Sequence, residues 1–260
     1  MDHKDVGKFW DENAENWTKL ARMGYDICRN HVNSPEFFNI LPDITGLKGL
    51  DIGCGEGFNT RIAAKKRSQM TAIDISEVFI NHAMEKEEEE PLGIKYQVAS
   101  AIELPFENES FDFVISTMAF MDMFEIDKAF KEAYRVLKPN GFFQFSITHP
   151  CFSLSETEWI YDDKGKRTGL ICRDYFKNID GDIEEWIFSA APEKITKNMK
   201  KFRVPRFKRT LSFWLNTVIN SGFTLEYFSE PFANDETIKN YPSLEATRII
   251  AWFLIIRCRK

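Results

Sequence analysis

The chain of 260 residues lacks an apolar segment long enough to cross a lipid bilayer. Its longest apolar run, 249–256, has eight residues, whereas a membrane-spanning helix needs ~20. The chain begins with charged residues, and no apolar stretch of the kind found in secretory signals follows them. We therefore expect a soluble, cytoplasmic protein.

The chain also has few cysteines and histidines, and its net charge is not positive. The five cysteines, at positions 28, 54, 151, 172 and 258, show no paired metal-ligand spacing, and their odd number argues against a disulfide framework. We expect no metal centre. The net charge of −6 gives no global electrostatic reason to bind nucleic acid. With 43% hydrophobic residues, the composition is typical of a globular protein with one large domain, alone or with a cap.

The most informative stretch of the sequence is 50–60, Leu-Asp-Ile-Gly-Cys-Gly-Glu-Gly-Phe-Asn-Thr. A short apolar run ends at Asp51, and a helical pattern follows three glycines. Gly53 and Gly57 suit backbone conformations that other residues avoid, and Gly55 lets a ligand approach the backbone. A dinucleotide site would need its third glycine at position 58, and a phosphate-binding loop would need a lysine. The spacing favours a ligand without phosphate, whose cationic amino acid end Asp51 attracts.

This Asp-x-Gly-x-Gly-x-Gly pattern resembles the nucleotide-binding signature of class I S-adenosylmethionine-dependent methyltransferases. A second predicted strand ends at Asp74, 23 positions after Asp51 (74 − 51). The segments 101–106, 111–116 and 134–141 resemble the small-molecule, "methyltransferase type 11"-like branch, which includes the quinone-biosynthesis C-methyltransferases. The resemblance is close over 47–148 and looser towards the C-terminus.

The resemblance implies S-adenosylmethionine as cofactor and S-adenosylhomocysteine as product. In that family an acid at the position of Asp74 holds the two ribose hydroxyls. The family's third strand usually leads to an aspartate that accepts from the adenine amino group, and here Ser100 or the backbone of Ala101 and Ile102 takes that place. The residues expected to bind the cofactor are Trp17, Asp51, Gly53, Cys54, Gly55, Gly57, Asp74, Ile75, Ser100, Ala101, Ile102, Thr117 and Met118.

The pattern of elements predicts an α/β fold. Strands are expected at 48–53, 69–74, 94–98, 111–116 and 141–147, and the helices between them at 58–66, 76–90 and 126–137. Such alternation indicates parallel strands with helices on both faces and a ligand at their carboxyl ends. A helix after Thr210 and strands at 223–229 and 248–257 complete the pattern, and by resemblance the last strand inserts antiparallel between its neighbours. We therefore expect a Rossmann-like, seven-stranded methyltransferase sheet, mostly parallel.

Residues 1–46 predict a helical cover in front of the methyltransferase domain at 47–260. Trp10, Trp17 and two alanines form one apolar stripe at helical spacing. Ser34 followed by Pro35 predicts a second helix that begins with a hydroxyl cap. The two tryptophans either lie over the cofactor crevice or only dock this segment onto the sheet.

Residues 149–209 interrupt the alternation of strands and helices. Asp162-Asp163-Lys164-Gly165 lies between two aromatic-rich runs and predicts a hairpin turn in a small antiparallel layer. We expect this insertion to cap the active site and to shape the acceptor pocket. Its last part, 194–209, carries eight Lys or Arg in 16 residues and is either a solvated loop or a patch for an anionic substrate or RNA.

In methyl transfer from a sulfonium, the protein mainly aligns the reactants and removes water from them. The lack of a nucleophile triad is therefore compatible with methyltransferase activity. His149 is the best candidate for a catalytic base, because it follows the fifth strand and could titrate near neutrality. A structural hydrogen-bonding role explains it as well. Weaker candidates are Asp122, Tyr161, Tyr175 and Glu230. Cys151 invites comparison with RNA cytosine-C5 methyltransferases, but their second cysteine is missing here.

We therefore expect a methyltransferase that acts on a small, partly apolar acceptor by in-line displacement. One alternative is an RNA methyltransferase that uses the basic run at 194–209. Another is a non-catalytic S-adenosylmethionine-binding partner protein.

Overall fold

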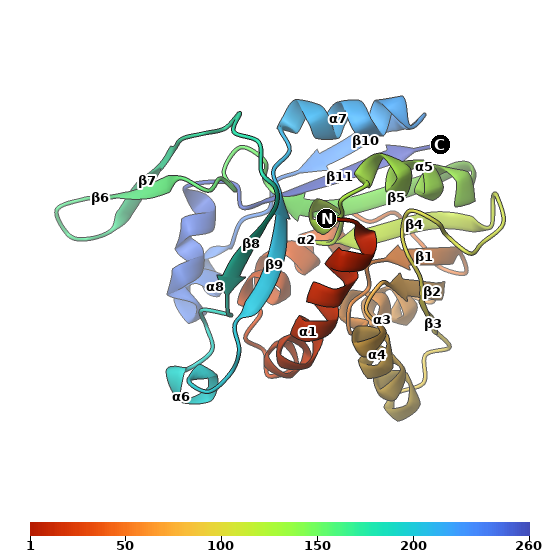
Figure 1. Cartoon of the computed structure of the whole chain (residues 1–260), viewed down its shortest axis with the longest axis horizontal. Helices are drawn as coiled ribbons and strands as arrows, with labels where there is room; N and C mark the ends of the chain where they lie inside the picture. Colours follow the sequence, from red (N-terminus) through yellow and green to blue (C-terminus); the bar gives the residue numbers. More distant parts are fainter.

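A seven-stranded sheet forms the centre of the computed structural model, which describes residues 1–260 (Figure 1). The strands are β1 (Lys48–Ile52), β2 (Gln69–Asp74), β3 (Lys95–Val98), β4 (Phe111–Thr117), β5 (Leu137–Thr148), β10 (Thr224–Ser229) and β11 (Phe253–Arg259). Their order is β10-β11-β5-β4-β1-β2-β3. The first five strands run parallel to one another, whereas β11 runs antiparallel to both β5 and β10. The predicted sheet with its antiparallel last strand is confirmed.

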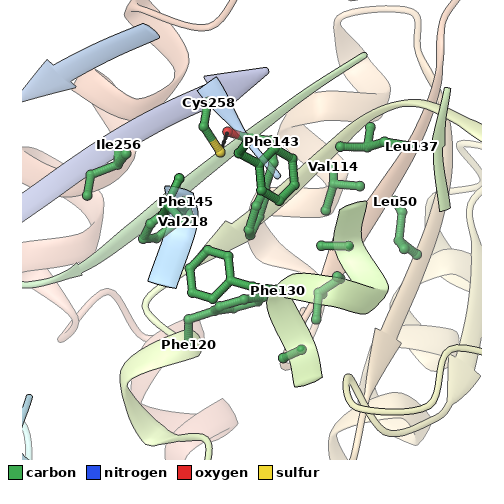
Figure 2. Close-up of a cluster of buried hydrophobic side chains, with 14 of the residues drawn as sticks. Leu50, Val114, Phe120, Phe130, Leu137, Phe143, Phe145, Val218, Ile256 and Cys258 are labelled. Carbon is green, nitrogen blue, oxygen red and sulfur yellow. Dashed lines mark hydrogen bonds between the residues drawn. The ribbon is translucent and has the colours of Figure 1, made fainter. Parts of the chain in front are cut away.

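Helices cover both faces of this sheet. Successive side chains of a strand point to opposite sides, and the strands carry apolar side chains on both faces that the helices bury. On one face lie α5 (Ile126–Val136) and α7 (Leu211–Asn220). There Phe130 and Val218 pack in one cluster with Phe143 and Phe145 of β5 (Figure 2). On the other face, α2 (Ser34–Asn39) and α3 (Phe58–Lys65) pack against residues of β2 and β4. A further helix, α4 (Glu77–Glu89), connects β2 to β3.

The last strand begins later than the expected position 248. A 3₁₀ segment, η3 (Pro242–Arg248), comes first, and its buried Leu244 belongs to a separate apolar cluster that includes Ile27 and Phe253. Thr247 stabilises this segment, because its hydroxyl donates to the Leu244 carbonyl and accepts from the Ala233 amide. A continuous apolar run does not mark where a strand begins, so this boundary was wrong.

The N-terminal part contains α1 (His3–Arg22) and a π-helical turn, η1 (Arg29–Asn33), that runs directly into α2. The predicted hydroxyl cap at Ser34 is wrong. Ser34 has helical backbone angles, and its Oγ donates instead to Asn59 Oδ1 at 2.7 Å. The Ser34 side chain therefore makes a tertiary hydrogen bond instead of the helix cap that its local sequence predicts.

The insertion forms two separate hairpins. The first, β6 (Thr157–Tyr161) and β7 (Arg167–Cys172), closes through the predicted turn, where Asp162 accepts from two backbone amides, and extends away from the sheet (Figure 1). The second, β8 (Asp180–Trp186) and β9 (Phe202–Phe207), lies beside α1 (Figure 1). A short helix, α6 (Glu193–Thr196), joins β8 to β9, and α8 (Asp235–Asn240) lies between β10 and η3. Of all the helices, none is both long enough and apolar enough to span a bilayer.

Asn13 joins α1 to the second hairpin. Its side-chain amide donates to the carbonyl of Arg203 at 3.0 Å, and its Oδ1 accepts from the amide of the same residue at 2.9 Å. The side chain thus satisfies the backbone of the outer strand β9, which has no strand partner on that side. The N-terminal helix and the insertion consequently form one wall.

Candidate active site

The turn after β1 holds three glycines with positive φ. A Cβ at Gly53 (φ +74°) would lie 2.4 Å from the Cβ of Ala119, and one at Gly57 (φ +82°) would lie 2.4 Å from the Tyr96 hydroxyl. At Gly55 (φ +54°) a Cβ would meet nothing within 4 Å. The first and third glycines therefore permit packing, while the middle one leaves space in front of the backbone, as predicted.

Two buried carboxylates flank this glycine turn. Asp74 Oδ2 accepts from the Gly55 amide at 2.8 Å, and its Oδ1 accepts from the Ser76 amide at 2.9 Å. Burial raises the pKa of Asp74 to about 6, against the lowering effect of these hydrogen bonds. A carboxylate oxygen can accept two hydrogen bonds, so Asp74 keeps acceptor capacity for a ligand's hydroxyls.

Asp51 lies entirely inside the protein, at the start of the same turn. Its Oδ2 accepts from the hydroxyl of Thr60 in α3 at 2.6 Å, but its Oδ1 has no hydrogen-bond partner. Burial raises the pKa of this carboxyl to about 7. An unsatisfied oxygen at such a position costs free energy, which a cationic ligand group could offset.

A cavity of about 620 Å³ opens in front of the turn, at the carboxyl ends of β1, β2 and β4. The residues predicted to bind the cofactor that line it are Trp17, Gly53, Cys54, Gly55, Asp74, Ile75, Ser100, Ala101, Ile102, Thr117 and Met118. The other two predicted residues, Asp51 and Gly57, belong to the same turn but do not line the cavity. The fold thus brings together side chains that are 101 positions apart in the chain (118 − 17).

His149 does not line the cavity. Its side chain is buried, its Nε2 lies 2.8 Å from Glu230 Oε1, and its Nδ1 accepts from the Cys151 amide at 3.2 Å. Burial lowers the pKa of His149, against the opposing effect of Glu230. Both ring nitrogens are therefore occupied in a structural contact, outside the space where an acceptor could sit. Tyr161, Tyr175, Glu230 and Cys151 also lie outside the cavity, whereas Asp122 is part of its wall.

Aromatic side chains from α1 and the second hairpin form the outer wall. The ring of Trp17 lies 5.5 Å from that of Trp10, 5.2 Å from Trp186 and 5.0 Å from Phe188, measured between centroids. Gly7 of α1 packs against Ile75, because a Cβ there would lie 3.1 Å from the isoleucine side chain. The predicted tryptophan stripe therefore both docks α1 and lines the cavity.

Sequence reasoning missed a buried charge cluster beside the turn. Glu56 is 3% exposed, and its carboxylate lies 3.3 Å from Arg22 Nε, 3.7 Å from Arg29 Nη1 and 2.9 Å from Arg61 Nη2. The guanidinium of Arg29 also lies 3.9 Å above the ring of Phe58. Only the Glu56–Arg61 pair, at five-residue spacing within one segment, left a local signal in the sequence.

The basic run at 194–209 is not a continuous free patch. Arg203 pairs with Glu12 and Glu185, Arg206 pairs with Glu184, and Lys208 pairs with Asp174. Arg209 points inward and donates to the carbonyls of residues 121, 123 and 124. Half of the eight basic side chains are thus committed within the protein, and the exposed lysines that remain are Lys194, Lys197, Lys200 and Lys201. The positive charge available for RNA is therefore about half of what the sequence suggests.

Comparison with known proteins supports this description of the fold. Residues 50–145 match the family model described as a methyltransferase domain. The ubiquinone/menaquinone biosynthesis C-methyltransferase of Rickettsia bellii is 37% identical over 116 residues, which are 42% of this chain and 46% of the relative. The corresponding protein of Bartonella bacilliformis is 33% identical over 157 residues, 58% of each chain. The chain therefore spans about half the length of the curated relatives it matches.

Solved structures extend the similarity over most of the chain. The S-adenosylmethionine-dependent methyltransferase from Mesorhizobium loti has a TM-score of 0.70 and 26% identity, covering 87% of this chain and 96% of its own. The [4+2]-cyclase SpnF has a TM-score of 0.65 at 16% identity, covering 100% of this chain and 96% of its own. At that identity the second likeness shows the fold alone.

Proposed function

We propose that the chain is a class I S-adenosylmethionine-dependent methyltransferase, which transfers a methyl group from S-adenosylmethionine to a small, partly apolar acceptor. The observation that carries the proposal is the open space in front of Gly55, which Asp74 borders while Asp51 lies buried behind the same turn. No side chain of the protein fills that space.

The residues present fit the cofactor. The unpartnered Oδ1 of Asp51 suits the ammonium end of the cofactor's amino acid tail. Asp74 retains acceptor capacity for the two ribose hydroxyls while the Gly55 and Ser76 amides hold its carboxylate in place. Ser100 and the backbone of Ala101 and Ile102 are proposed to meet the adenine.

A bound sulfonium donor supplies an electrophilic methyl group and leaves as a neutral thioether, so the protein's task is to align the reactants and to exclude water. Trp17 and Trp186 separate the cavity from solvent on one side. Met118 and Met121 line it next to the turn and provide an adaptable apolar surface.

The acceptor is proposed to be a small, partly apolar molecule because most of the side chains that line the remaining wall are apolar. We propose that the insertion at 149–209 acts as the acceptor cap through 184–189 and 204–206, since its cavity-lining residues all fall there. The relatives are named as C-methyltransferases of quinone biosynthesis, which is consistent with such an acceptor. Because all five cysteines are free thiols, we propose a reducing cytoplasm as the setting.

The test is calorimetric titration of S-adenosylhomocysteine into wild type, Gly55→Val and Gly46→Val. Both glycines have positive φ and open space at the Cβ position, so valine strains the backbone by a similar ~1–3 kcal/mol at each site. Only Gly55 borders the cavity. We expect Gly55→Val to weaken binding at least ~10-fold, while Gly46→Val loses stability but binds like wild type.

No binding to wild type at millimolar S-adenosylhomocysteine would overturn the proposal. Equal affinity of all three proteins would overturn the placement of the ligand. Tight binding with no methylated product across a wide acceptor panel, followed by mass spectrometry, would favour the non-catalytic binder instead.

A further inference from the structure

A carboxylate separate from the two at the glycine turn faces the cavity from the loop after β4. Asp122 is the last residue of the 3₁₀ turn η2 (Phe120–Asp122), and its amide donates to the carbonyl of Ala119 at 3.0 Å. Ala119 and Met123, on either side of this turn, are the side chains closest to a Cβ position at Gly53. The loop that carries Asp122 is therefore pressed against the glycine turn.

Asp122 is the buried acid of this site that has no partner. It is 8% exposed and lines the cavity, yet no hydrogen bond from the protein reaches its carboxylate. By contrast, the carboxylates of Asp51 and Asp74 both accept hydrogen bonds. Burying an unpaired carboxylate is costly, and it is unusual unless the group acts on something that enters the cavity.

The charged groups around Asp122 are already engaged elsewhere. On the second hairpin, Arg206 pairs with Glu184 and donates to the hydroxyl of Ser153 at 3.1 Å. The guanidinium group of Arg209 donates its hydrogen bonds to backbone carbonyls. His3 of α1, which also lines the cavity, lies 3.5 Å from Glu125. These neighbours leave the oxygens of Asp122 free.

Burial raises the pKa of Asp122 to about 7, an effect that Glu184 reinforces and that Arg206 and Arg209 oppose. A group with this pKa is partly ionised at neutral pH and can still take up a proton. General bases work best when their pKa lies near the working pH.

On the basis of the proposed function, we propose that Asp122 is the catalytic base, which removes the proton from a hydroxyl or amino group of the acceptor as that atom is methylated. The acceptor's O–H or N–H bond breaks and its proton passes to the Asp122 carboxylate. A lone pair of that oxygen or nitrogen forms the new bond to the methyl carbon, and the electron pair of the broken O–H or N–H bond stays on the same atom. The pair of the broken carbon–sulfur bond stays on sulfur, so charge and atoms balance.

This assignment narrows the class of acceptor. Apart from the charged neighbours just described, the cavity wall in this region carries apolar side chains, among them Met121, Met123 and Phe124 of the same loop and Val204 of β9. An acceptor that fits both features has a single protic group, O–H or N–H, on an apolar body. Nucleophiles without an ionisable proton, such as thioethers, would gain nothing from the carboxylate.

The test measures methyl transfer to 2-naphthol and 2-naphthylamine, with 2-methoxynaphthalene as the matched compound that has no protic group. The proteins are wild type, Asp122→Asn, Asp122→Glu and Asp127→Asn. Asp127 is an exposed carboxylate of the neighbouring helix that does not line the cavity. For wild type we expect turnover of the two protic compounds only, with kcat rising as pH increases through about 7. Asp122→Asn should lower kcat about 10²–10⁴-fold and flatten the pH profile, Asp122→Glu should restore part of the rate, and Asp127→Asn should behave like wild type.

A readout without turnover is the infrared carbonyl band of a protonated carboxyl in the S-adenosylhomocysteine complex. As pH rises through about 7, wild type should lose one carbonyl band that Asp122→Asn lacks, whereas any band that both proteins lose belongs to another carboxyl group such as Asp51 or Asp74. All four proteins should bind S-adenosylhomocysteine within threefold of one another. Failure of wild type to bind would reject the proposed function itself. Normal binding with no turnover of either protic compound, or with an unchanged rate and pH profile in Asp122→Asn, would reject only the role of Asp122.

Discussion

At the scale of single residues, the site combines groups that are expensive to bury. Asp51 has one carboxylate oxygen bonded to Thr60 and one with no partner, inside a protein wall that excludes water. The free energy of this arrangement is recovered only when a cation comes near. The same residue should therefore weaken the empty protein and strengthen the complex.

The variant Asp51→Asn tests this trade-off. The folded-state pKa of Asp51 is raised to about 7, whereas the unfolded value is ~3.9, so its contribution to stability is complete below pH ~4 and is lost as pH rises towards 7. At about 1.4 kcal/mol per pKa unit this loss is about 4 kcal/mol. In urea unfolding of the ligand-free proteins, the free energy of unfolding of Asp51→Asn should increase relative to that of wild type between pH 5 and pH 8.

Affinity should change in the opposite direction. Because asparagine carries no charge to attract an ammonium group, S-adenosylhomocysteine should bind Asp51→Asn about tenfold more weakly at pH 8, a difference of ~1.4 kcal/mol. Calorimetry measures this directly. Parallel stability curves for the two proteins across the pH range, or equal affinities, would contradict the assignment.

At the scale of elements, Glu56 connects three of them to the glycine turn. Arg22 ends α1, Arg29 begins η1, and Arg61 lies in α3, and all three guanidinium groups lie around this one buried carboxylate. Arg61 also donates to the carbonyl of Glu56 at 2.7 Å. The charge cluster therefore ties the N-terminal cover to the turn that forms the floor of the cavity.

The variant Glu56→Gln should destabilise the protein by about 3–5 kcal/mol, because it leaves the buried guanidinium of Arg61 without its counter-charge. The matched control is Glu158→Gln, which breaks an ion pair with Arg173 in which both side chains are more than half exposed. Exposed pairs contribute ~0–1 kcal/mol, so this control should unfold almost like wild type. Urea unfolding monitored by tryptophan fluorescence would report both changes. A loss of similar size in the two variants would show that the cluster does not hold the cover in place.

At the scale of the whole molecule, the cavity lies between a rigid sheet edge and a wall made by two distant parts of the chain. The floor comes from strand ends within 51–118, while the outer wall combines α1 with the hairpin β8–β9. Trp17 and Asn13 join the two parts of that wall. The other hairpin, β6–β7, contributes nothing to the cavity.

Binding of S-adenosylhomocysteine should therefore slow amide hydrogen exchange unevenly. At a ligand concentration about 100 times Kd, linkage stabilises the folded protein by about 2.7 kcal/mol. Exchange that reports local opening should slow in α1, in the glycine turn and in β8–β9, while β6–β7 serves as an internal control with unchanged rates. Mass spectrometry of peptic fragments resolves these regions. Uniform protection that includes β6–β7 would show that the outer wall is not specifically coupled to the site.

The sequence alone determined the sheet, the glycine turn and the acid at the end of β2. These features depend on contacts within a few positions of the chain: alternation of apolar residues, glycines that relieve steric conflict, and an acid directly after a strand. Asp74, Gly55 and Thr210, the last of which caps α7 as predicted, are examples.

Tertiary structure alone decided which polar side chains face the cavity. His149 had the more suggestive position in the sequence, yet its ring is bound to Glu230, whereas Asp122 in the preceding loop faces the space in front of the turn. Likewise, Ser34 had the sequence of a helix cap and serves a distant asparagine. Local pattern cannot settle these cases, because the direction and hydrogen-bond partners of a side chain depend on segments that come together only on folding.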